Sequence, residues 1–273
     1  MYIKWLKTNL FNNESQATIF SNLNFSCFSS KFAFIKKIRA MQLFYVPGIS
    51  GNEIILDETE SKHAVKVLRL GKGDSIFCTD GTGGFYTALI TDANPKKCRL
   101  NVIESSHQVG KKDYYTHIAI APTKNNDRLE WFLEKATEIG IDEISLLLCE
   151  NSERKTVKTD RLEKVLVSAM KQSVKAYLPR LNELVSFSEF IAGSNADQKF
   201  IAHCREHNLP HMKHLVQKGK SVLVLIGPEG DFSTSEVENA AKYGFEAISL
   251  GDSRLRTETA GVVSCQIVNL TNV

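Results

Sequence analysis

Beyond about residue 112, short apolar runs alternate with longer stretches whose apolar residues repeat at helical spacing. The short runs predict buried strands over 117–121, 144–148, 199–203, 222–226 and 245–250. Helices are predicted over 160–173 and 261–270, and a third begins at the capping box Ser233–Glu236. A fourth helix is predicted to end at Gly140, because one apolar face precedes this glycine at helical spacing: Leu129, Phe132, Leu133, Ala136 and Ile139. This alternation favours an α/β fold with a mostly parallel sheet and helices on both faces.

The stretch from Met41 to about residue 107 has a different pattern, with short strands close together and glycine turns between them. Strands are predicted over 75–79, 84–90 and 99–103, and one helix over 60–68, closed by Gly71. This spacing predicts a small β-barrel or sandwich. Gly110–Asp113 resembles a linker, so we expect one domain over 41–111 and a second over 112–273.

Residues 1–40 lack periodicity and carry a net charge of +5. Lys4, Lys7 and the break at Asn12-Asn13-Glu14 exclude the apolar core of a secretory signal. The basic, Ser-containing composition leaves a transit peptide open. We favour a non-native or disordered extension upstream of Met41, which would be the true initiator.

Composition narrows the class of protein. With 42% hydrophobic residues, 273 residues suffice for one or two domains with real cores, and the sequence lacks the roughly 18-residue apolar run of a membrane helix. Its six cysteines are widely spaced without a Cys-x-x-Cys motif, which suits reduced thiols in the cytoplasm. The net charge is +3, but residues 41–273 carry −2, so any surface that binds nucleic acid must be a local basic patch.

Two loops with glycine follow neighbouring strand-like runs. Gly227-Pro-Glu-Gly230 comes directly after 222–226, and Leu250–Ala260 comes after 245–250. Parallel sheets bind ligands at the carboxyl ends of their strands, and glycine lets a ligand approach the backbone closely. The first loop alone also fits an ordinary turn. In the second, Thr257 is the expected helix N-cap, and Arg254 and Arg256 beside a helix start favour an anion.

The pair GPEG and LRTETA closely resembles the C-terminal signature of the ribosomal RNA uridine-N3 methyltransferases of the SPOUT class. The resemblance implies a trefoil-knotted methyltransferase domain, preceded by a small PUA-like RNA-binding barrel. It also implies that the loops enclose S-adenosylmethionine. The implied cofactor-binding residues are Ile226, Gly227, Pro228, Glu229, Gly230, Leu250, Gly251, Leu255, Arg256, Thr257, Thr259 and Ala260. The chain departs from the family at Asp231, where glycine is usual, and at Asp252-Ser253-Arg254, where proline, arginine and an aliphatic residue are usual.

The same resemblance implies a substrate, 16S ribosomal RNA of the small ribosomal subunit, methylated at N3 of a uridine in the decoding region. Arg256 and Arg254 are the candidates for stabilising the developing uridine anion, with Glu258 as the general base and Asp231 as second choice. RNA contacts are expected from His63, Lys66, Arg69, Lys124, Arg128, Gln172 and Lys175, although helix charges are usually only solvated. Family members are homodimers, and we expect the same here.

Other functions remain open. A ribose 2′-O-methyltransferase of the same class would have different sequences in the two glycine loops. A non-catalytic RNA-binding assembly factor would tolerate the loss of the cofactor-binding residues from these loops, but both loops are nearly intact here. A dinucleotide-dependent oxidoreductase is disfavoured because no G-x-G-x-x-G motif is present. The cluster His203, Cys204, His207, His211 and His214 invites a zinc interpretation, but Pro210 interrupts any helix that could align it, so no metal is expected.

Overall fold

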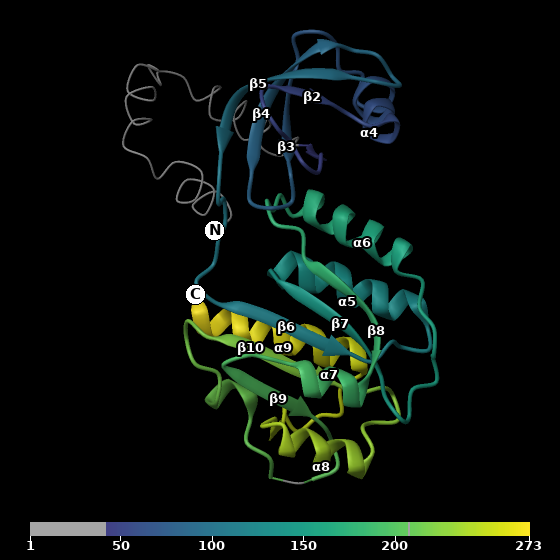
Figure 1. Cartoon of the computed structure of the whole chain (residues 1–273), viewed down its shortest axis with the longest axis vertical. Coiled ribbons are helices and arrows are strands. Elements are labelled where there is room, and N and C mark those ends of the chain that lie inside the picture. Colours follow the sequence, from purple (N-terminus) through teal and green to yellow (C-terminus); the bar gives the residue numbers. More distant parts are fainter. Residues whose placement is uncertain (1–41, 207) are drawn as a thin grey trace. The chain divides into compact units, whose positions relative to one another are not determined.

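The computed structural model describes residues 42–206 and 208–273, so the expectations for residues 1–40 lie outside the described part. The chain forms two compact units (Figure 1). One contains the described residues up to Lys111 together with Val174–Tyr177, and the other contains Lys112–Ser173 and Leu178–Val273. No helix among the described residues is both long and apolar enough to cross a membrane.

The N-terminal unit is built on a mixed five-stranded sheet in the order β1-β3-β4-β5-β2. Its strands are β1 (Leu43–Tyr45), β2 (Glu53–Ile55), β3 (Ser75–Thr79), β4 (Phe85–Asp92) and β5 (Arg99–Ser106). Among the described strands of this sheet, only β1 and β3 pair in parallel. Large buried side chains such as Phe44, Leu56 and Ile90 form the core of this unit. The three predicted strands are confirmed, and the described strands leave a half-barrel whose edges are β1 and β2.

The helix predicted over 60–68 is two helices of different pitch. The α-helix α4 (Glu58–Lys62) begins at Asp57, whose carboxylate accepts the Glu60 N–H, and it continues as the π-helix η2 (His63–Val67). Buried Ser61 holds this element on the sheet, because its hydroxyl donates to the Leu56 carbonyl and accepts the Cys98 N–H at 2.9 Å.

A short segment from the middle of the chain completes the N-terminal unit. The Ala176 carbonyl accepts the Gly83 N–H at 2.9 Å and the hydroxyl of Thr79 at 3.3 Å. Tyr177 lies so close to Gly83 that any Cβ there would overlap its ring. A boundary at one position in the sequence, as predicted near residue 112, therefore omits a segment that returns to the first unit.

The C-terminal unit contains a six-stranded, fully parallel sheet in the order β11-β9-β10-β6-β7-β8. The strands are β6 (Tyr115–Ile120), β7 (Glu143–Leu148), β8 (Arg180–Ser186), β9 (Gln198–Ala202), β10 (Ser221–Ile226) and β11 (Glu246–Ile248). The prediction of a parallel sheet is confirmed. The edge strand β8 is not among the strands that the sequence predicts.

Helices cover both faces of this sheet, as predicted. They are α5 (Asn126–Ile139), α6 (Thr159–Gln172), α7 (Phe187–Gly193), α8 (Thr234–Lys242) and α9 (Thr257–Asn272), with the short 3-10 helix η3 (Met212–His214). One apolar cluster joins the sheet to α5, α6 and α9, and a second joins it to α7 and α8. Inward-facing side chains therefore alternate between two cores along each central strand.

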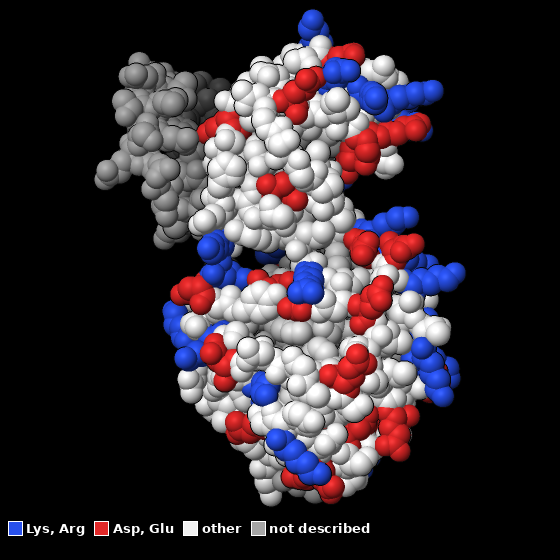
Figure 2. Space-filling model, in the orientation of Figure 1, with Lys and Arg blue, Asp and Glu red and all other residues white. Residues whose placement is uncertain are grey.

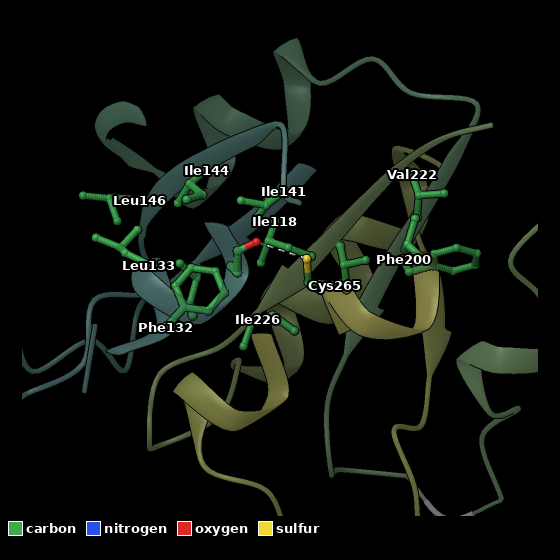
Figure 3. Packing of buried hydrophobic residues seen from close by; sticks show 14 of the residues in the cluster. Ile118, Phe132, Leu133, Ile141, Ile144, Leu146, Phe200, Val222, Ile226 and Cys265 are labelled. Atoms are coloured by element: carbon green, nitrogen blue, oxygen red, sulfur yellow. Dashed lines mark hydrogen bonds between the residues drawn. The ribbon is translucent and has the colours of Figure 1, made fainter. Parts of the chain in front are cut away.

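The packing of α9 on α5 lies at the centre of the larger core (Figure 3). Phe132 of α5 lies against Gly261 of α9, and the Cys265 thiol is 3.9 Å from the Ala136 carbonyl. Glycine at 261 is what lets these helices approach so closely, since a Cβ would be 2.6 Å from the Phe132 ring.

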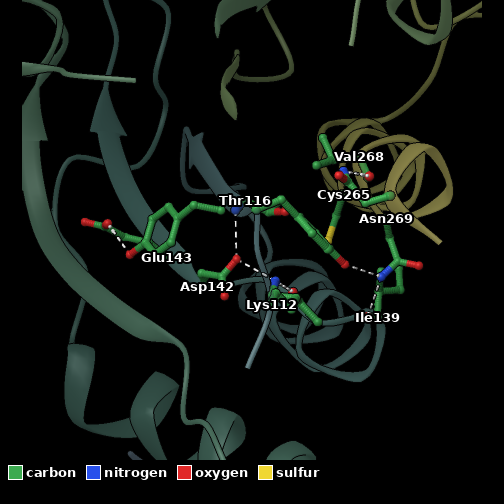
Figure 4. Close-up of polar contacts among 12 residues, drawn as sticks. Lys112, Thr116, Ile139, Asp142, Glu143, Cys265, Val268 and Asn269 are labelled. Atoms are coloured by element: carbon green, nitrogen blue, oxygen red, sulfur yellow. Dashed lines mark hydrogen bonds and ion pairs between the residues drawn. The ribbon is translucent and has the colours of Figure 1, made fainter. Parts of the chain in front are cut away.

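Polar contacts hold the start of this unit to its last helix (Figure 4). The Asp142 carboxylate accepts hydrogen bonds from the Lys112 ammonium at 2.5 Å and the Thr116 N–H at 2.8 Å. Near the end of α9, the Asn269 amide donates to the Tyr114 hydroxyl at 3.1 Å. The Asn269–Tyr114 bond ties the end of α9 to the start of this unit, and the Asp142 bonds tie the same start to the residue that precedes β7.

Candidate functional site

A cleft of about 880 Å³ opens at the carboxyl ends of β9, β10 and β11. Its wall comes from three loops. The described residues 203–206, 208 and 209 follow β9, residues 227–231 follow β10, and residues 249–256 follow β11. All of the predicted cofactor residues line this cleft except Gly230 and Thr259. At Gly230 a Cβ would be 3.1 Å from the Asn151 Cβ, so this glycine makes room for a neighbouring loop.

A buried hydrogen bond joins the two glycine loops. The Thr257 hydroxyl donates to the Gly227 carbonyl at 3.1 Å, and Thr257 is only 6% exposed. The prediction that Thr257 caps α9 is wrong, because the N-cap is Arg256, which makes no side-chain cap bond. The threonine hydroxyl bonds across to the other loop, and so it stabilises the cleft.

The two arginines predicted to be catalytic, Arg254 and Arg256, both line the cleft and are exposed. Among the described residues, neither forms an ion pair with a carboxylate. Acidic side chains also line the cleft, and one of them, Glu229, accepts the Lys124 N–H at 3.0 Å. The cleft thus combines free guanidinium groups with carboxylates, which suits a ligand that carries both signs of charge.

Glu258, the predicted general base, does not line the cleft. It lies in the first turn of α9 and is 6% exposed. One carboxylate oxygen is 3.8 Å from Nε of Arg128, and the other is buried without a hydrogen-bond partner among the described residues. The helix dipole favours an anion at this position. Arg128, predicted to contact RNA, is therefore engaged with Glu258.

The loop after β9 contributes cleft residues that the sequence did not indicate. The sequence points to His203 and Cys204 only as metal ligands, yet both line the cleft. The described residues contain no group of side chains that could hold a metal ion, and His207 lies outside them. Asp231 has a left-handed backbone (φ +64°), and its carboxylate accepts the N–H groups of Cys204 at 3.0 Å and Phe232 at 2.8 Å.

The predicted RNA-binding residues lie at separate places. Lys66 of η2 and Arg69 are exposed on the N-terminal unit, where His63 is partly buried against Phe44. On the C-terminal unit Lys124 is exposed, and the hydrogen bond from its ammonium to Glu153 raises its pKa.

The other two predicted RNA-binding residues, Gln172 and Lys175, lie just before and just after the point where the chain returns to the N-terminal unit. Gln172 lines a groove of about 280 Å³ between α5 and α6, and Lys175 belongs to the segment in the N-terminal unit. Basic and acidic side chains are interspersed on the visible face of each unit (Figure 2). On this face, therefore, charge alone does not define an RNA surface.

Family comparisons match both units. Residues 111–269 match the family described as an RNA methyltransferase domain, and residues 56–103 match an RNA methyltransferase PUA domain. The chain belongs to the RNA methyltransferase family. The cleft at the carboxyl ends of β9, β10 and β11 lies within the matched methyltransferase domain.

Individual relatives agree with this assignment. A solved structure of a probable rRNA-methyltransferase from Porphyromonas gingivalis is 42% identical, with a TM-score of 0.80 over 85% of this chain and 98% of that one. Curated relatives named ribosomal RNA small subunit methyltransferase E include those of Buchnera aphidicola, 27% identical over 84% of this chain and 93% of its own length, and Bacillus subtilis, 26% identical over 77% and 87%. A Neisseria gonorrhoeae enzyme of that name, solved bound to S-adenosyl methionine, shares the fold at 22% identity, with a TM-score of 0.74 over 85% of this chain and 98% of that one.

Proposed function

We propose that this protein transfers a methyl group from S-adenosylmethionine to N3 of a uridine in the decoding region of 16S ribosomal RNA. The observation that carries the proposal is the cleft formed by Gly227–Gly230 and Leu250–Ala260 within the matched methyltransferase domain. The names of the relatives support ribosomal RNA of the small subunit as the substrate.

The cleft fits the proposed cofactor in size and in chemistry. Pockets for ligands of this size commonly span about 300–1,000 Å³. A Cβ at Gly227 would be 3.1 Å from the Phe232 ring, so a side chain there would crowd the base of the loop. Arg254 and Arg256 can bind the carboxylate of the cofactor, and Glu229 and Asp231 suit its positive charges. The predicted cofactor residues are therefore retained, with Gly230 as a packing residue.

Bound S-adenosylmethionine supplies an electrophilic methyl group, and the residues of the chain prepare the uridine. The N3–H is a weak acid, so a cationic group beside it stabilises the anion that accepts the methyl group. Arg256 and Arg254 both line the cleft without an ion pair to a described carboxylate, so one can hold the carboxylate of the cofactor while the other stabilises the uridine anion. Asp231 lines the cleft, whereas Glu258 would accept a proton at its unpartnered oxygen. The two carboxylates remain rival candidates for the base.

RNA binding is assigned to both units. Lys66 and Arg69 on the PUA-like unit present exposed charges to phosphate groups, which position the substrate without reading sequence. Lys124 and Gln172 would contact RNA from the methyltransferase unit. We also propose a cytoplasmic homodimer, and a trefoil knot in which the loop after β11 is threaded through the loop after β10. The Thr257–Gly227 hydrogen bond brings these two loops into contact, as a knot of this kind requires.

The test is a methyl-transfer assay. Full-length protein is incubated with radiolabelled S-adenosylmethionine and small ribosomal subunits from a strain lacking the modification, and the digested nucleosides are resolved. Label in 3-methyluridine is expected. Label in a 2′-O-methyl nucleoside would show that the protein methylates ribose instead of the uridine base. If the RNA carries no label and the protein does not bind the cofactor, the protein is a non-catalytic RNA-binding factor and the proposal is wrong.

A further inference from the structure

The loop after β7, residues 149–154, supports the loop after β10 from outside the cleft. No residue of this described segment lines the cleft, and the proposed reaction uses none of them. The Asn151 amide donates to the Asp231 carbonyl at 2.9 Å. The Glu150 N–H donates to the Glu236 carboxylate, in the first turn of α8, at 2.9 Å. These two bonds hold the loop after β10 at its far end, where the chain enters α8.

Arg154, at the end of this segment, binds a third loop. Its Nε donates to the Thr123 carbonyl at 3.0 Å, and its Nη2 donates to the Lys124 carbonyl at 2.6 Å. Both residues lie between β6 and α5, and Thr123 is fully buried. A guanidinium group that donates to two successive carbonyls holds both peptide groups in one orientation, because its donors form a rigid fork. Stabilisation of α5 does not explain the contact, since the helix dipole disfavours a cation near a helix N-terminus.

The segment that Arg154 holds contacts the cleft wall through one backbone N–H. The Lys124 N–H donates to Oε1 of Glu229 at 3.0 Å, and Glu229 lines the cleft. Among the described residues, the Glu229 carboxylate forms no other hydrogen bond or ion pair. Arg154 and Glu229 therefore bind the carbonyl and the N–H of the same residue, so that a change at the guanidinium alters the only bond that orients this carboxylate.

The orientation of Glu229 matters because the ligand proposed for this cleft carries positive charges as well as a carboxylate. Arg254 and Arg256, from the loop after β11, suit the carboxylate, and Glu229 suits a positive charge. A side chain that is already ordered loses less conformational entropy on binding, and so it binds more tightly. The Lys124 N–H orders the Glu229 carboxylate before the ligand binds.

We propose that Arg154 is a positioning residue for the methyl transfer. It fixes the peptide groups of Thr123 and Lys124, and through the Lys124 N–H it fixes the Glu229 carboxylate that binds a positive charge of the cofactor. This inference rests on the proposed function, because it takes the cleft to be the cofactor site.

Steady-state kinetics of the full-length protein test this role, with S-adenosylmethionine and small ribosomal subunits varied in turn. We expect Arg154→Ala to raise KM for S-adenosylmethionine by about tenfold, the size of one lost hydrogen bond to a charged group, and to leave kcat and KM for the RNA near their original values. Arg154→Lys keeps one donor and should recover part of the loss. Arg161→Ala is the matched control and should change neither KM, because this arginine binds Glu130 with two nitrogens but has no contact with the three loops.

A double-mutant cycle separates positioning from a general loss of stability. Glu229→Gln removes the charge of this side chain but keeps an oxygen that accepts the Lys124 N–H. If Arg154 acts through Glu229, Arg154→Ala should have little further effect on KM in protein that already carries Glu229→Gln. Effects that multiply would overturn the proposal, and so would an increase in KM for the RNA alone, which would make Arg154 an RNA contact.

The outcomes distinguish this inference from the proposed function. If the unaltered protein neither binds S-adenosylmethionine nor transfers its methyl group, the proposed function fails and the role of Arg154 fails with it. An unchanged KM of Arg154→Ala in a protein that does transfer methyl groups overturns only the role of Arg154. Hydrogen exchange measured by NMR needs no ligand. The Lys124 N–H should exchange faster in Arg154→Ala than in the unaltered protein, and equal exchange rates would contradict the positioning.

Discussion

Replacing Gly261 by alanine tests the account of how α9 is placed. A Cβ at this position would be 2.6 Å and 2.8 Å from two carbon atoms of the Phe132 ring, and 3.2 Å from the Ile120 Cδ1. Both neighbours are fully buried in the larger core, so neither can move into solvent. The added methyl group therefore forces α9 away from α5 or the ring out of its position.

Two opposing effects set the magnitude. Overpacking of a well-packed core costs about 1–3 kcal/mol, and contacts as short as these correspond to the upper end. Alanine gains roughly 1 kcal/mol over glycine in helix propensity. The net loss of folding free energy is about 2 kcal/mol, which lowers the melting temperature of a unit of this size by roughly 4–8 °C.

The assay is thermal unfolding of the full-length protein followed by circular dichroism. Gly193→Ala is the control, because this glycine at the end of α7 has nothing within 4 Å of an added Cβ, and it should not lower the melting temperature. Adding Phe132→Leu to Gly261→Ala should cost less than the two single changes together, since the smaller side chain leaves room for the methyl group. A melting temperature of Gly261→Ala at or above that of the unaltered protein would refute the close-packing argument.

Three further predictions concern other parts of the molecule. Thr257→Val removes the donor to the buried Gly227 carbonyl, so calorimetry should show weaker binding of S-adenosylmethionine, by about tenfold; unchanged affinity would mean that this bond does not shape the cleft. Lys66→Gln should weaken RNA binding and reduce the salt dependence of affinity by about one unit of slope, whereas an unchanged slope would remove Lys66 from the phosphate contacts. Burial raises the pKa of Asp80, but hydrogen bonds to its carboxylate outweigh this and lower it. The stability that it contributes is present above its unfolded pKa of about 3.9 and is lost as the pH falls through the folded value, so Asp80→Asn should reduce the acid-induced drop in urea midpoint.

Hydrophobic periodicity predicted the elements that are buried and regular, and it failed where elements are short or lie at an edge. The strand predicted over 75–79 has the bounds of β3, and the helix face ending at Gly140 is that of α5. In contrast, β8 has half-buried positions on both faces, so its sequence shows neither alternation nor a continuous apolar run. The π-helix η2 has the same apolar residues as an α-helix would, and local sequence does not distinguish them.

The cleft could be located from sequence only where glycine marks a loop. Gly227 and Gly251 indicated the loops after β10 and β11, and both line the cleft. The loop after β9 has no such signal, and therefore His203 was considered only as a metal ligand. Likewise the contact between Glu258 and Arg128 could not be predicted from the sequence, because Arg128 lies in a helix 130 residues earlier in the chain.

Strand order explains why these three loops form one site. Strand β9 lies between β10 and β11, so the chain must pass the end of β9 to reach β11 at the edge of the sheet. The next helix, α9, packs against α5, β6 and β10, nearer the middle of the sheet. The loop over residues 249–256 must therefore return across the carboxyl ends of β9 and β10 before α9 can begin. This path brings Arg254 and Arg256 beside the glycine loop and the His203 loop, so the position of the cleft follows from the order of the strands as much as from the motifs themselves.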